Sequence, residues 1–583
     1  MDWPWRIIAL DEAQKTARRQ SLDRHAAYAQ LSALVPIALF LLYRFMSWVV
    51  KRLTPQRGFY SAVPGSPTLK RARRSTTGSL ASLLRRFAWW FSDDVVFLGK
   101  TWGQRDQIII GIIWTVWLMF LCVVDTGNDY IHLTKRFGIV ALSQLPMQYL
   151  LALKSINPIA FVFSSSHEQV NRWHRVLGWI IYFLLFLHVS FFLNFYIQEG
   201  VLAERIVRLI PALGLGSFIG LSFMNTTALR IVRQYSYRVF FITHLIVAFS
   251  LPPAIFFHSH HGGREYVIEA LAVFVLDIMK RRFDTITAPA TLERIPGTSL
   301  VKIVASLPPK KLGRFRKYHG MHVYLSIPIA ARRASGANFA AFLLFEATFN
   351  PFTIALVNEE SQNLTLIARC QNGLMTKTLA RLAQNHLTGT KIPLNIDGTY
   401  GCAKKFPSLT GSEFNRILLV AGGVGATYIL PLYRKYTIFS SPGALRLITT
   451  ESPAARVRMV WAVREAGDAT WPVNGTAGSI LDDENLHLYL TGDVFGDADQ
   501  VTDSGDEDDA IELASNLDTD SRRMGKRPDL KKIVDDFFKQ GLEERVAVIV
   551  CGPEAMAREL KSHVGVWVQK GRNVWWHNES FVW

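Results

Sequence analysis

Residues 172–192 read RWHRVLGWIIYFLLFLHVSFF, a run that is free of charge after Arg175 and that carries His174 and His188. These two histidines lie fourteen positions apart. An α-helix turns by about 100° per residue, so fourteen steps end about 40° short of four full turns. Both imidazoles therefore share one face of a helix and are separated by a rise of about 21 Å along its axis.

The same spacing recurs further along the chain. Residues 238–261 read RVFFITHLIVAFSLPPAIFFHSHH, in which His244 and His258 are again fourteen positions apart. On two helices that run in the same direction, His174 would face His244 and His188 would face His258. Neutral imidazole is the ligand that haem iron takes on both axial faces in electron-transfer cytochromes, and polar groups inside a membrane are usually functional.

We therefore interpret the four histidines as ligands of two stacked haems, with hydrogen-bonded packing residues as the alternative. A zinc site fits less well, because zinc gathers its ligands at one depth and these histidines occupy two. An iron with both axial positions filled cannot bind a substrate directly. The pattern thus predicts a conduit for single electrons across a membrane.

Apolar runs of membrane length crowd the first half of the chain. Most reach about 17–25 residues, which is enough to cross about 30 Å of hydrocarbon as a helix. A further run, Tyr266–Met279, is shorter and carries Glu269 and Asp277, so it is the weakest of the set. The other predicted spans are Ala33–Phe40 extended on both sides, Ile108–Val124, Phe137–Leu153, Val176–Ile197, Leu209–Leu229 and Val239–His258.

Basic residues predict the orientation of these spans. The connection Lys51–Arg86 holds nine Lys and Arg residues and no Asp or Glu, so we place it in the cytosol. Alternation then places Arg230–Arg238 and Lys280–Arg282 inside, with the amino terminus outside and the carboxyl terminus inside. Met1–His25 shows no apolar segment typical of a cleavable signal peptide.

Composition excludes several classes of protein. The 583 residues are 49% hydrophobic and carry a formal net charge of +18, which rules out disorder, collagen and coiled coil as the main architecture. Such a charge is typical of nucleic-acid binders and of membrane proteins with basic loops. The clustering of basic residues beside the spans favours membrane lipid over nucleic acid as the partner. The four widely separated cysteines favour neither a disulfide framework nor a cysteine zinc site.

After Arg282 the pattern changes to short strand-like runs, turns and amphipathic helices, with no further span. Ser299–Ala305, His322–Ile327 and Leu364–Ala368 are examples of predicted strands. Residues from about 493 to 525 are rich in Asp, Glu, Ser and Thr, so we expect a disordered acidic insertion there.

A glycine-rich turn marks the last part of the chain. Residues 416–436 read RILLVAGGVGATYILPLYRKY, an apolar strand that runs through GGVGAT into a helix. Glycines let a backbone approach a phosphate or nicotinamide ring, and a helix amino end favours anions. The alternative is an ordinary tight turn between strand and helix. Residues 545–556, RVAVIVCGPEAM, repeat the strand-to-loop design.

Other short motifs precede and follow these loops in a fixed order. They are NPFT at Asn350, Pro351, Phe352 and Thr353; a turn from Gly373 to Thr376; VWAVR at Val460–Arg464; GKRPDL at Gly525–Leu530; CGPEAM from Cys551; and ESFVW at Glu579–Trp583.

From about Phe137 to Trp583 the chain resembles fungal ferric-chelate reductases of the ferric reductase and NADPH oxidase superfamily. The resemblance implies a multi-domain membrane protein: an all-α transmembrane di-haem bundle of about seven helices, a ferredoxin-reductase-type β-barrel FAD domain, and an α/β NADPH-binding domain. Together with the predicted spans, this gives the divisions 1–25 outside the cytosol, 26–135 with the first two spans, 136–282 for the haems, 283–412 for FAD and 413–583 for NADPH.

The implied mechanism is hydride transfer from NADPH to FAD, followed by single-electron steps through two b-type haems to ferric or cupric chelates. Cys551 would lie on the hydride path, and Trp583 would stack on the flavin unless it is simply a packed terminal aromatic. Arg464 and the pair Lys526 and Arg527 are candidates for the 2′-phosphate, although the pair is as readily solvated surface charge. The implied cofactor contacts are Asn350, Pro351, Phe352, Thr353, Gly373, Thr376, Gly422, Gly423, Gly425, Thr427, Arg464, Gly552 and Pro553.

One departure from the family pattern stands at Asn350, where the flavin motif has histidine, so we expect weaker flavin retention. The closest alternative function is a superoxide-generating NADPH oxidase, and a further one is a non-enzymatic reductase-like membrane protein. His260 and His261 are either solvated or able to capture metal, and replacement of His258 as a ligand by one of them is a further alternative. An iron permease or multicopper oxidase is a candidate partner, and the plasma membrane is the expected location, with the vacuolar membrane as the alternative.

Overall fold

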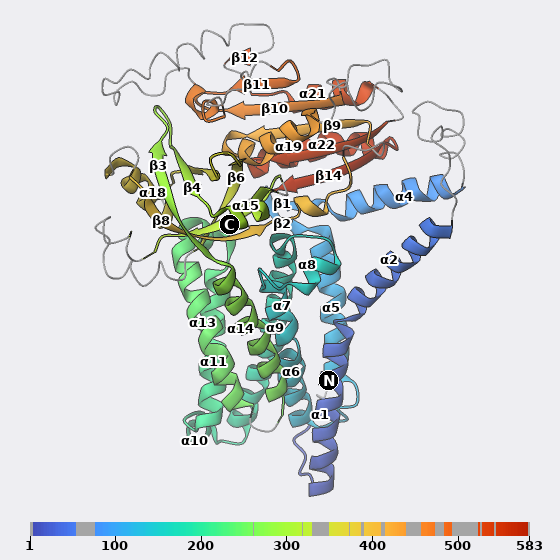
Figure 1. Ribbon diagram of the computed structural model, residues 1–583. Helices are drawn as coiled ribbons and strands as arrows, with labels where there is room; N and C mark the ends of the chain where they lie inside the picture. Colours follow the sequence, from blue (N-terminus) through green and yellow to red (C-terminus); the bar gives the residue numbers. More distant parts are fainter. Residues whose placement is uncertain are drawn as a thin grey trace. The chain divides into compact units, whose positions relative to one another are not determined.

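The computed structural model describes two units (Figure 1). The described residues are 4–53, 76–259, 262–316, 319–328, 331, 349–371, 373–385, 390–409, 414–438, 456–472, 483–492, 523–524, 527–540 and 544–580. Among them, 4–53 and 91–283 belong to a helical unit, and 76–90 and 284–580 belong to a second unit that holds the barrel and the parallel sheet.

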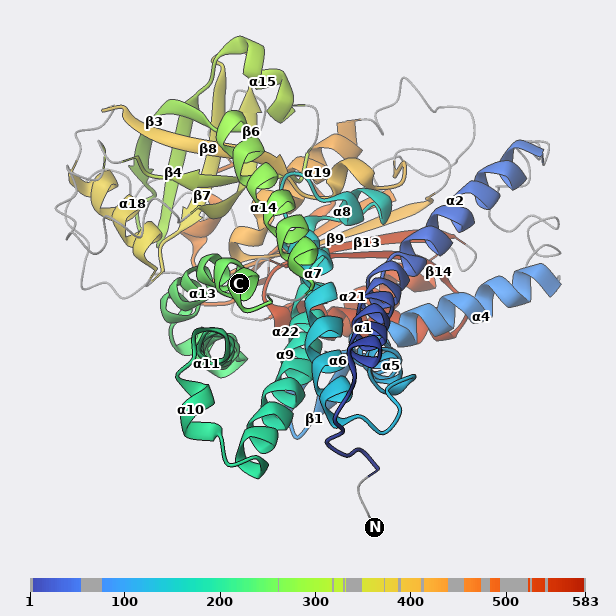
Figure 2. The ribbon, with the colours of Figure 1, turned by 90° about the horizontal axis from the view of Figure 1, so that it is seen from below.

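The helical unit is built from long apolar helices joined by short connections. Its main helices lie side by side, with α6 beside α9 and α11 beside α13 (Figures 1 and 2). A short hairpin, β1 (Asp94–Phe97) and β2 (Lys100–Gln104), precedes α5. The helices are α1 (Glu12–Ser32), α2 (Val35–Leu53), α5 (Arg105–Val123), α6 (Tyr130–Ser143), α7 (Leu145–Ala152), α8 (Pro158–Val162), α9 (His167–Gln198), α10 (Leu202–Ile206), α11 (Leu209–Thr227), α12 (Arg230–Tyr235), α13 (Tyr237–His258) and α14 (Arg264–Asp284).

Five helical segments of the described chain are long and apolar enough to cross a membrane: Glu12–Val50, Arg105–Val123, His167–Gln198, Leu209–Thr227 and Tyr237–His258. The predicted span Phe137–Leu153 is instead divided into α6 and α7. Pro146 stands at the start of α7, where its missing N–H is tolerated, so the break at Gln144 has a local cause. The predicted span Tyr266–Met279 lies within α14. Seven spans therefore stay a prediction.

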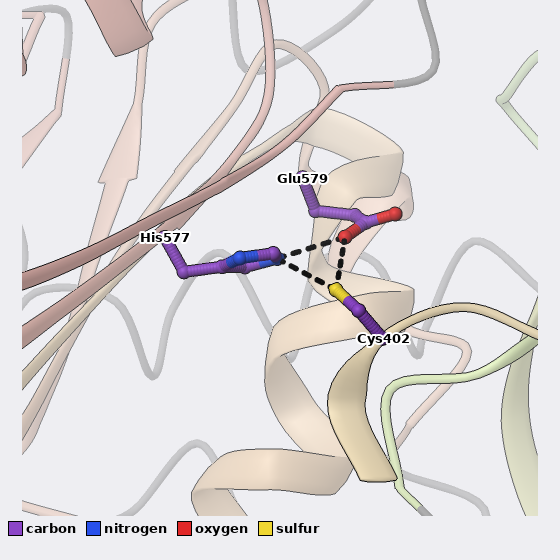
Figure 3. Close-up of side chains that lie close together, drawn as sticks. All are labelled: Cys402, His577 and Glu579. Atoms are coloured by element: carbon purple, nitrogen blue, oxygen red, sulfur yellow. Dashed lines mark hydrogen bonds and ion pairs between the residues drawn. The ribbon is translucent and has the colours of Figure 1, made fainter. Parts of the chain in front are cut away.

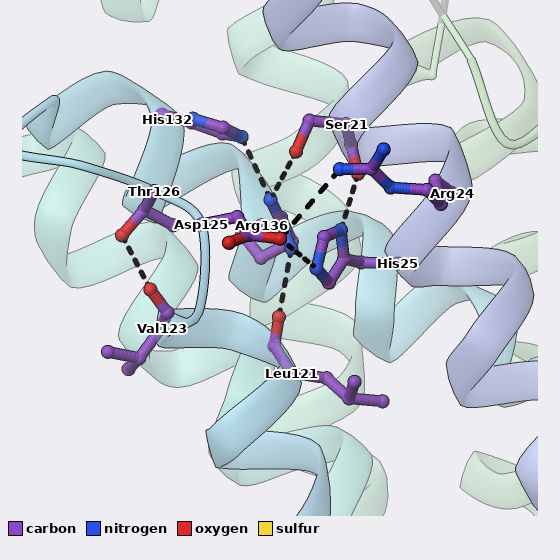
Figure 4. A network of polar contacts seen from close by, with 9 residues as sticks. All are labelled: Ser21, Arg24, His25, Leu121, Val123, Asp125, Thr126, His132 and Arg136. Atoms are coloured by element: carbon purple, nitrogen blue, oxygen red, sulfur yellow. Dashed lines mark hydrogen bonds and ion pairs between the residues drawn. The ribbon is translucent and has the colours of Figure 1, made fainter.

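A buried polar network attaches α1 to α5 and α6 (Figure 4). The Arg136 guanidinium is fully buried and donates to Ser21 Oγ at 2.9 Å and to the Leu121 carbonyl at 3.0 Å. His132 Nε2 lies 3.0 Å from the same guanidinium. A buried charge without such partners would be strongly destabilising, so this network fixes how α1 packs.

The second unit begins with a closed six-stranded barrel in the order β3-β4-β7-β6-β5-β8, whose neighbouring strands pair antiparallel in the described residues. Side chains that alternate along the strands, such as Val301, Ile303 and Leu366, fill its core. Each of the three predicted strand runs coincides with a strand, β4, β5 or β7, and their ends differ from the observed ones by at most one residue. The elements are β3 (Ile286–Arg294), β4 (Leu300–Ser306), α15 (Pro309–Arg316), β5 (His322–Ser326), β6 (Asn350–Asn358), β7 (Asn363–Arg369), α18 (Leu374–Asn385) and β8 (Ile392–Tyr400).

A parallel six-stranded sheet follows in the order β12-β11-β10-β9-β13-β14. Alternate residues of β9 face opposite sides: Leu419 packs with α19, and Leu418 packs with α21 and α22. Helices on both faces make this a doubly wound sheet. Its elements are β9 (Arg416–Gly422), α19 (Ala426–Ile438), β10 (Val457–Val463), β11 (Leu486–Leu490), β12 (Arg523–Met524), α21 (Leu530–Lys539), β13 (Arg545–Cys551), α22 (Glu554–Gln569) and β14 (Asn573–Glu579).

Most of the predicted acidic insertion, residues 493–522, lies outside the described residues. Arg523 and Met524 pair with β11 as strand β12, so the expected disorder does not extend to them. The same unit includes helix α4 (Thr76–Phe91) up to Trp90, which comes from the connection between the first two predicted spans.

Candidate functional site

The two histidine pairs face each other between α9 and α13. The ring centroids of His174 and His244 are 6.1 Å apart, and those of His188 and His258 are 6.3 Å apart. Ser166 caps the start of α9, and Ser236 caps the start of α13. Each helix is continuous from its cap through both of its histidines. The structure thus brings together the residues that the spacing had paired.

Backbone carbonyls of neighbouring helices hold three of the four rings. Nδ1 of His188 lies 2.8 Å from the Thr134 carbonyl on α6, and Nδ1 of His258 lies 2.8 Å from the Ile210 carbonyl on α11. Nδ1 of His174 lies 3.0 Å from the carbonyl of Gln148 on α7. A proton on Nδ1 that is donated to a carbonyl leaves Nε2 as the lone-pair nitrogen, which is the arrangement of a metal-binding imidazole.

The ring separations fit one metal ion between each pair. Centroid separations of 6.1 and 6.3 Å leave room for a metal ion between the two rings of each pair. His244 also has a buried Nδ1 with no hydrogen-bond partner among the described residues. Each pair offers two imidazoles at one depth, a donor set that suits a haem iron.

Two glycines make room for the rings of His188 and His258. A Cβ at Gly138 would lie 2.7 Å from the His188 ring, and one at Gly214 would lie 2.4 Å from the His258 ring. Any side chain at these positions would displace an imidazole. Neither these glycines nor the carbonyls that hold the rings were predicted from the sequence. A glycine inside an apolar span is nevertheless a signal that a neighbouring helix approaches closely.

The glycine-rich loop lies where the order of the parallel strands reverses. β9 is flanked by β10 on one side and by β13 on the other, and their carboxyl ends lie at one edge of the sheet. This edge is the place where doubly wound sheets bind nucleotides. Gly422 and Gly552 approach each other here, because a Cβ on Gly552 would lie 3.0 Å from the Gly422 nitrogen.

Gly425 is the most crowded residue of the loop. Its ideal Cβ would lie 2.2 Å from the Cys551 carbonyl oxygen, so only glycine fits. Gly423 adopts a φ of 55°, in the left-handed region, and its carbonyl accepts a hydrogen bond from Trp461 Nε1 at 3.1 Å. Thr427 Oγ1 donates to the Val424 carbonyl at 2.8 Å. Pro553, after the second loop, lies 2.6 Å from a Cβ built on Gly422.

Cys551 ends β13 at this edge and is buried. Burial, and then the carboxylate of Glu579, raise the pKa of the Cys551 thiol well above its ordinary value. The group is therefore a neutral thiol across the physiological pH range. Arg464 follows β10 at the same edge and is exposed.

The barrel carries the other predicted contacts. Asn350, Pro351, Phe352 and Thr353 start β6, where Pro351 pairs with Tyr324 of β5. Thr376 Oγ1 donates to the carbonyls of Gln371 and Gly373 at 3.0 and 3.2 Å, which closes the turn that opens α18. A surface pocket beside this turn is lined by Cys370, Gln371, Lys377, Ala380 and Arg381. The side chains of Lys377 and Arg381 lie close to the amino end of α18, and this combination favours the binding of a phosphate group.

Four of the residues singled out in the sequence lie outside the described residues: His260, His261, Lys526 and Trp583. Arg527 is described and exposed. Sequence reasoning missed a buried cluster of Cys402, His577 and Glu579, because Cys402 lies 175 positions from His577 in the chain and the three form no spacing motif.

Residues 137–255 match the family described as "Ferric reductase like transmembrane component", and residues 414–565 match "Ferric reductase NAD binding domain". The probable metalloreductase AIM14 of Candida dubliniensis is 23% identical over 402 residues, which are 67% of this chain and 66% of that protein. Ferric/cupric reductase transmembrane component 2 of Schizosaccharomyces pombe is 22% identical over 530 residues, 84% of this chain and 88% of that protein. A solved structure, the cytochrome b5 reductase domain of Ulva prolifera nitrate reductase, aligns with 50% of this chain and 97% of its own at 15% identity and a TM-score of 0.30.

Proposed function

The chain belongs to the fungal ferric-chelate reductase family, and on that premise we propose that it passes electrons from cytosolic NADPH through FAD and two b-type haems to ferric or cupric chelates across the membrane. It is an integral membrane metalloreductase with a nucleotide-binding domain, and metal chelates are its class of electron acceptor. The haems, the preference for NADPH and the direction of transfer are the proposal.

One observation supports the electron path above all others. Two imidazole pairs face each other at two depths of one helical unit, at separations that fit axial coordination. Haems bound here would supply single-electron chemistry, and the imidazoles of the two histidine pairs would hold them. The carbonyls of Thr134, Gln148 and Ile210 orient the rings.

The cytosolic unit would hold the two-electron donor and its acceptor. A flavin supplies the chemistry of accepting a hydride and releasing single electrons. Lys377, Arg381 and the turn closed by Thr376 would bind its phosphates, and the start of β6 would border its ring. Gly422, Gly423 and Gly425 admit a nicotinamide close to the backbone, beside the neutral Cys551 thiol. Trp583 stays a proposed stacking partner for the flavin.

Arg464 is proposed to recognise the 2′-phosphate of NADPH. A hydrogen bond to a charged group contributes about 1.5–3 kcal/mol, so Arg464→Ala is expected to lower the NADPH preference roughly 10–100-fold. Turnover with NADH serves as the internal control and should stay unchanged. An unaltered ratio of NADPH to NADH turnover would remove Arg464 from the site.

Asn350 is proposed to contact the flavin less well than the family's histidine. Asn350→His is expected to tighten flavin binding by about one hydrogen bond, 0.5–1.5 kcal/mol, or roughly 2–10-fold. Asn358→His, at the far end of β6, is the matched control. Fluorescence of flavin released from equal amounts of purified protein measures the effect, and equal retention in all three proteins would contradict it.

Superoxide production by the same cofactors is the competing outcome. Equal spacing in both histidine pairs resembles the reductase branch of the superfamily, and this favours chelates over oxygen. Superoxide release and ferric-chelate reduction measured in the same membranes separate the two functions. Superoxide formation that exceeds chelate reduction would overturn the metalloreductase assignment.

We further propose the plasma membrane, with a cytosolic carboxyl terminus, as the location, and the vacuolar membrane as the alternative. The basic connection Lys51–Arg86 supports this orientation. Reduced metal leaving the outer face would suit an iron permease or a multicopper oxidase as a partner.

A further inference from the structure

Three buried side chains with different metal-binding chemistry meet in the cytosolic unit (Figure 3). Cys402 follows β8 at the end of the barrel, and His577 and Glu579 lie on β14 at one end of the parallel sheet. All three are at most 6% exposed. Barrel and sheet are thereby joined by residues that are 175 positions apart in the chain.

One ring nitrogen lies at the centre of the cluster. His577 Nε2 is 2.8 Å from Glu579 Oε2, 3.8 Å from Cys402 Sγ and 3.2 Å from the Tyr428 hydroxyl. Cys402 Sγ is 4.0 Å from the same Glu579 oxygen. A relay of the Cys-His-acid type uses both ring nitrogens, one toward the nucleophile and the other toward the acid. Here the Glu579 carboxylate, the Cys402 sulfur and the Tyr428 hydroxyl all lie near the same nitrogen, His577 Nε2. Ligand atoms that surround one metal ion are arranged in this way.

The donor set has the chemistry of a zinc site. Thiolate, imidazole and carboxylate bind zinc at about 2.3, 2.0 and 2.1 Å, which places tetrahedral ligand atoms about 3.3–3.6 Å apart. The three observed separations, 2.8, 3.8 and 4.0 Å, bracket that range, so small side-chain movements would suffice. A thiolate and a carboxylate with one divalent cation also form a neutral group, which suits a buried position. The sulfur ligand disfavours calcium and magnesium.

We propose that Cys402, His577 and Glu579 bind one zinc-type divalent cation, with the Tyr428 hydroxyl or a water molecule as the fourth ligand. The ion would connect the segment after β8, at the end of the barrel, to β14, the last strand of the sheet. Its role is structural, because all protein ligands are buried and no electron need pass through it. It is separate from the histidine pairs of the helical unit.

Elemental analysis of the purified full-length protein, expressed with added zinc, tests the proposal. About one zinc per chain is expected in the wild type and in Cys370→Ser, a control at a half-buried cysteine outside the cluster. Cys402→Ser and His577→Gln should each lose most of the zinc while they keep the flavin and the haem spectrum. Absence of zinc from the wild type, or equal zinc in the wild type and both cluster variants, would overturn the site.

A second inference rests on helix α4. At about 100° per residue, Leu80, Leu83 and Leu84 fall within one sector of about 100°. Each is 57% to 62% exposed. Phe87 and Trp90 extend the same stripe and are also exposed. An exposed apolar stripe of this kind marks an interaction surface.

The opposite face of α4 packs on the nucleotide-binding domain. Trp89 makes an edge contact with Trp576 of β14 at 5.8 Å between centroids, and Lys561 of α22 lies 5.9 Å from the Trp89 ring. A Cβ at Gly565 would lie 2.8 Å from Trp89 Nε1. Trp89 lies about 180° around the helix from Leu80, so α4 has one protein-facing side and one apolar side.

Chain continuity and charge indicate what the leucines contact. α4 is connected through residues 54–75 to α2 and through residues 92–104 to α5, which are both part of candidate membrane spans. No acidic residue occurs from Lys51 to Ser92. Amphipathic helices with these properties lie in the interface of an anionic leaflet. We infer that the face formed by Leu80, Leu83 and Leu84 binds the cytosolic surface of the membrane and anchors the nucleotide-binding domain there.

Spin labelling of the full-length protein in vesicles of phosphatidylcholine and phosphatidylserine tests this anchor. A label at Leu83→Cys, in a Cys370→Ser background that leaves only buried cysteines, should collide with oxygen and be protected from a water-soluble nickel chelate. Leu356→Cys, an exposed leucine on β6, is the control and should show the reverse. A Leu83 label as open to nickel as the control, or protected from both reagents by protein, would overturn the inference.

Discussion

Replacing His244 by alanine is expected to remove one of the two b-type haem signals and to lower NADPH-driven chelate reduction at least about 100-fold. Changes in the outer shell of a metal site already cost 10–100-fold, so loss of a ligand should exceed that range. His188→Ala should have a similar effect through the other pair. Reduced-minus-oxidised spectra and chelate reduction rates measure both consequences.

Thr243→Ala, the neighbouring residue on α13, is the matched control for His244→Ala. Reduction of a soluble dye by NADPH should persist in all of these variants, because it needs only the unit that holds the barrel and the parallel sheet. Undiminished haem signals in both histidine variants would show that the facing pairs do not hold haem.

The second large effect is expected at Gly425. Gly425→Ala places a methyl group 2.2 Å from the Cys551 carbonyl oxygen, a clash with backbone that no rotamer relieves. Forced overpacking costs about 1–3 kcal/mol or more, which would lower the melting temperature of the second unit by roughly 3–10 °C. NADPH turnover should fall further, because the loop would move away from β13.

Gly313→Ala provides the control for this change. Gly313 lies in helix α15, and a Cβ there meets nothing within 4 Å among the described residues. Its melting temperature should be equal to or above that of the wild type, since alanine favours a helix over glycine by about 0.5–1 kcal/mol. A Gly425→Ala protein that melts and turns over like the wild type would contradict the close packing of β9 and β13.

Helix periodicity was sufficient to predict the histidine pairs. His174 and His188 share a face because fourteen residues nearly complete four turns, and the second helix obeys the same rule. What holds the rings could not be predicted. The carbonyls of Thr134 and Ile210 come from helices whose packing depends on many side chains, and backbone acceptors leave no mark in a sequence.

The second unit, with the barrel and the parallel sheet, was also only partly predictable from the sequence. Each strand-to-loop motif could be identified in the sequence. The strand order, which places the loops after β9 and β13 at one edge of the sheet, could be determined only from the structure. The break at Gln144 was missed because hydropathy alone does not register Pro146 as a helix start. The cluster of Cys402 and His577 depends on contacts across 175 residues, which no local pattern encodes.

Sealed vesicles that expose the cytosolic unit outward test the central claim most directly. NADPH is supplied outside, ferric and cupric chelates are trapped inside, and haem spectra are recorded during the reaction. The account predicts reduction of trapped chelate that starts with NADPH, passes through reduced haem and fails in His244→Ala. Oxidation of NADPH with no reduction of trapped chelate would contradict it.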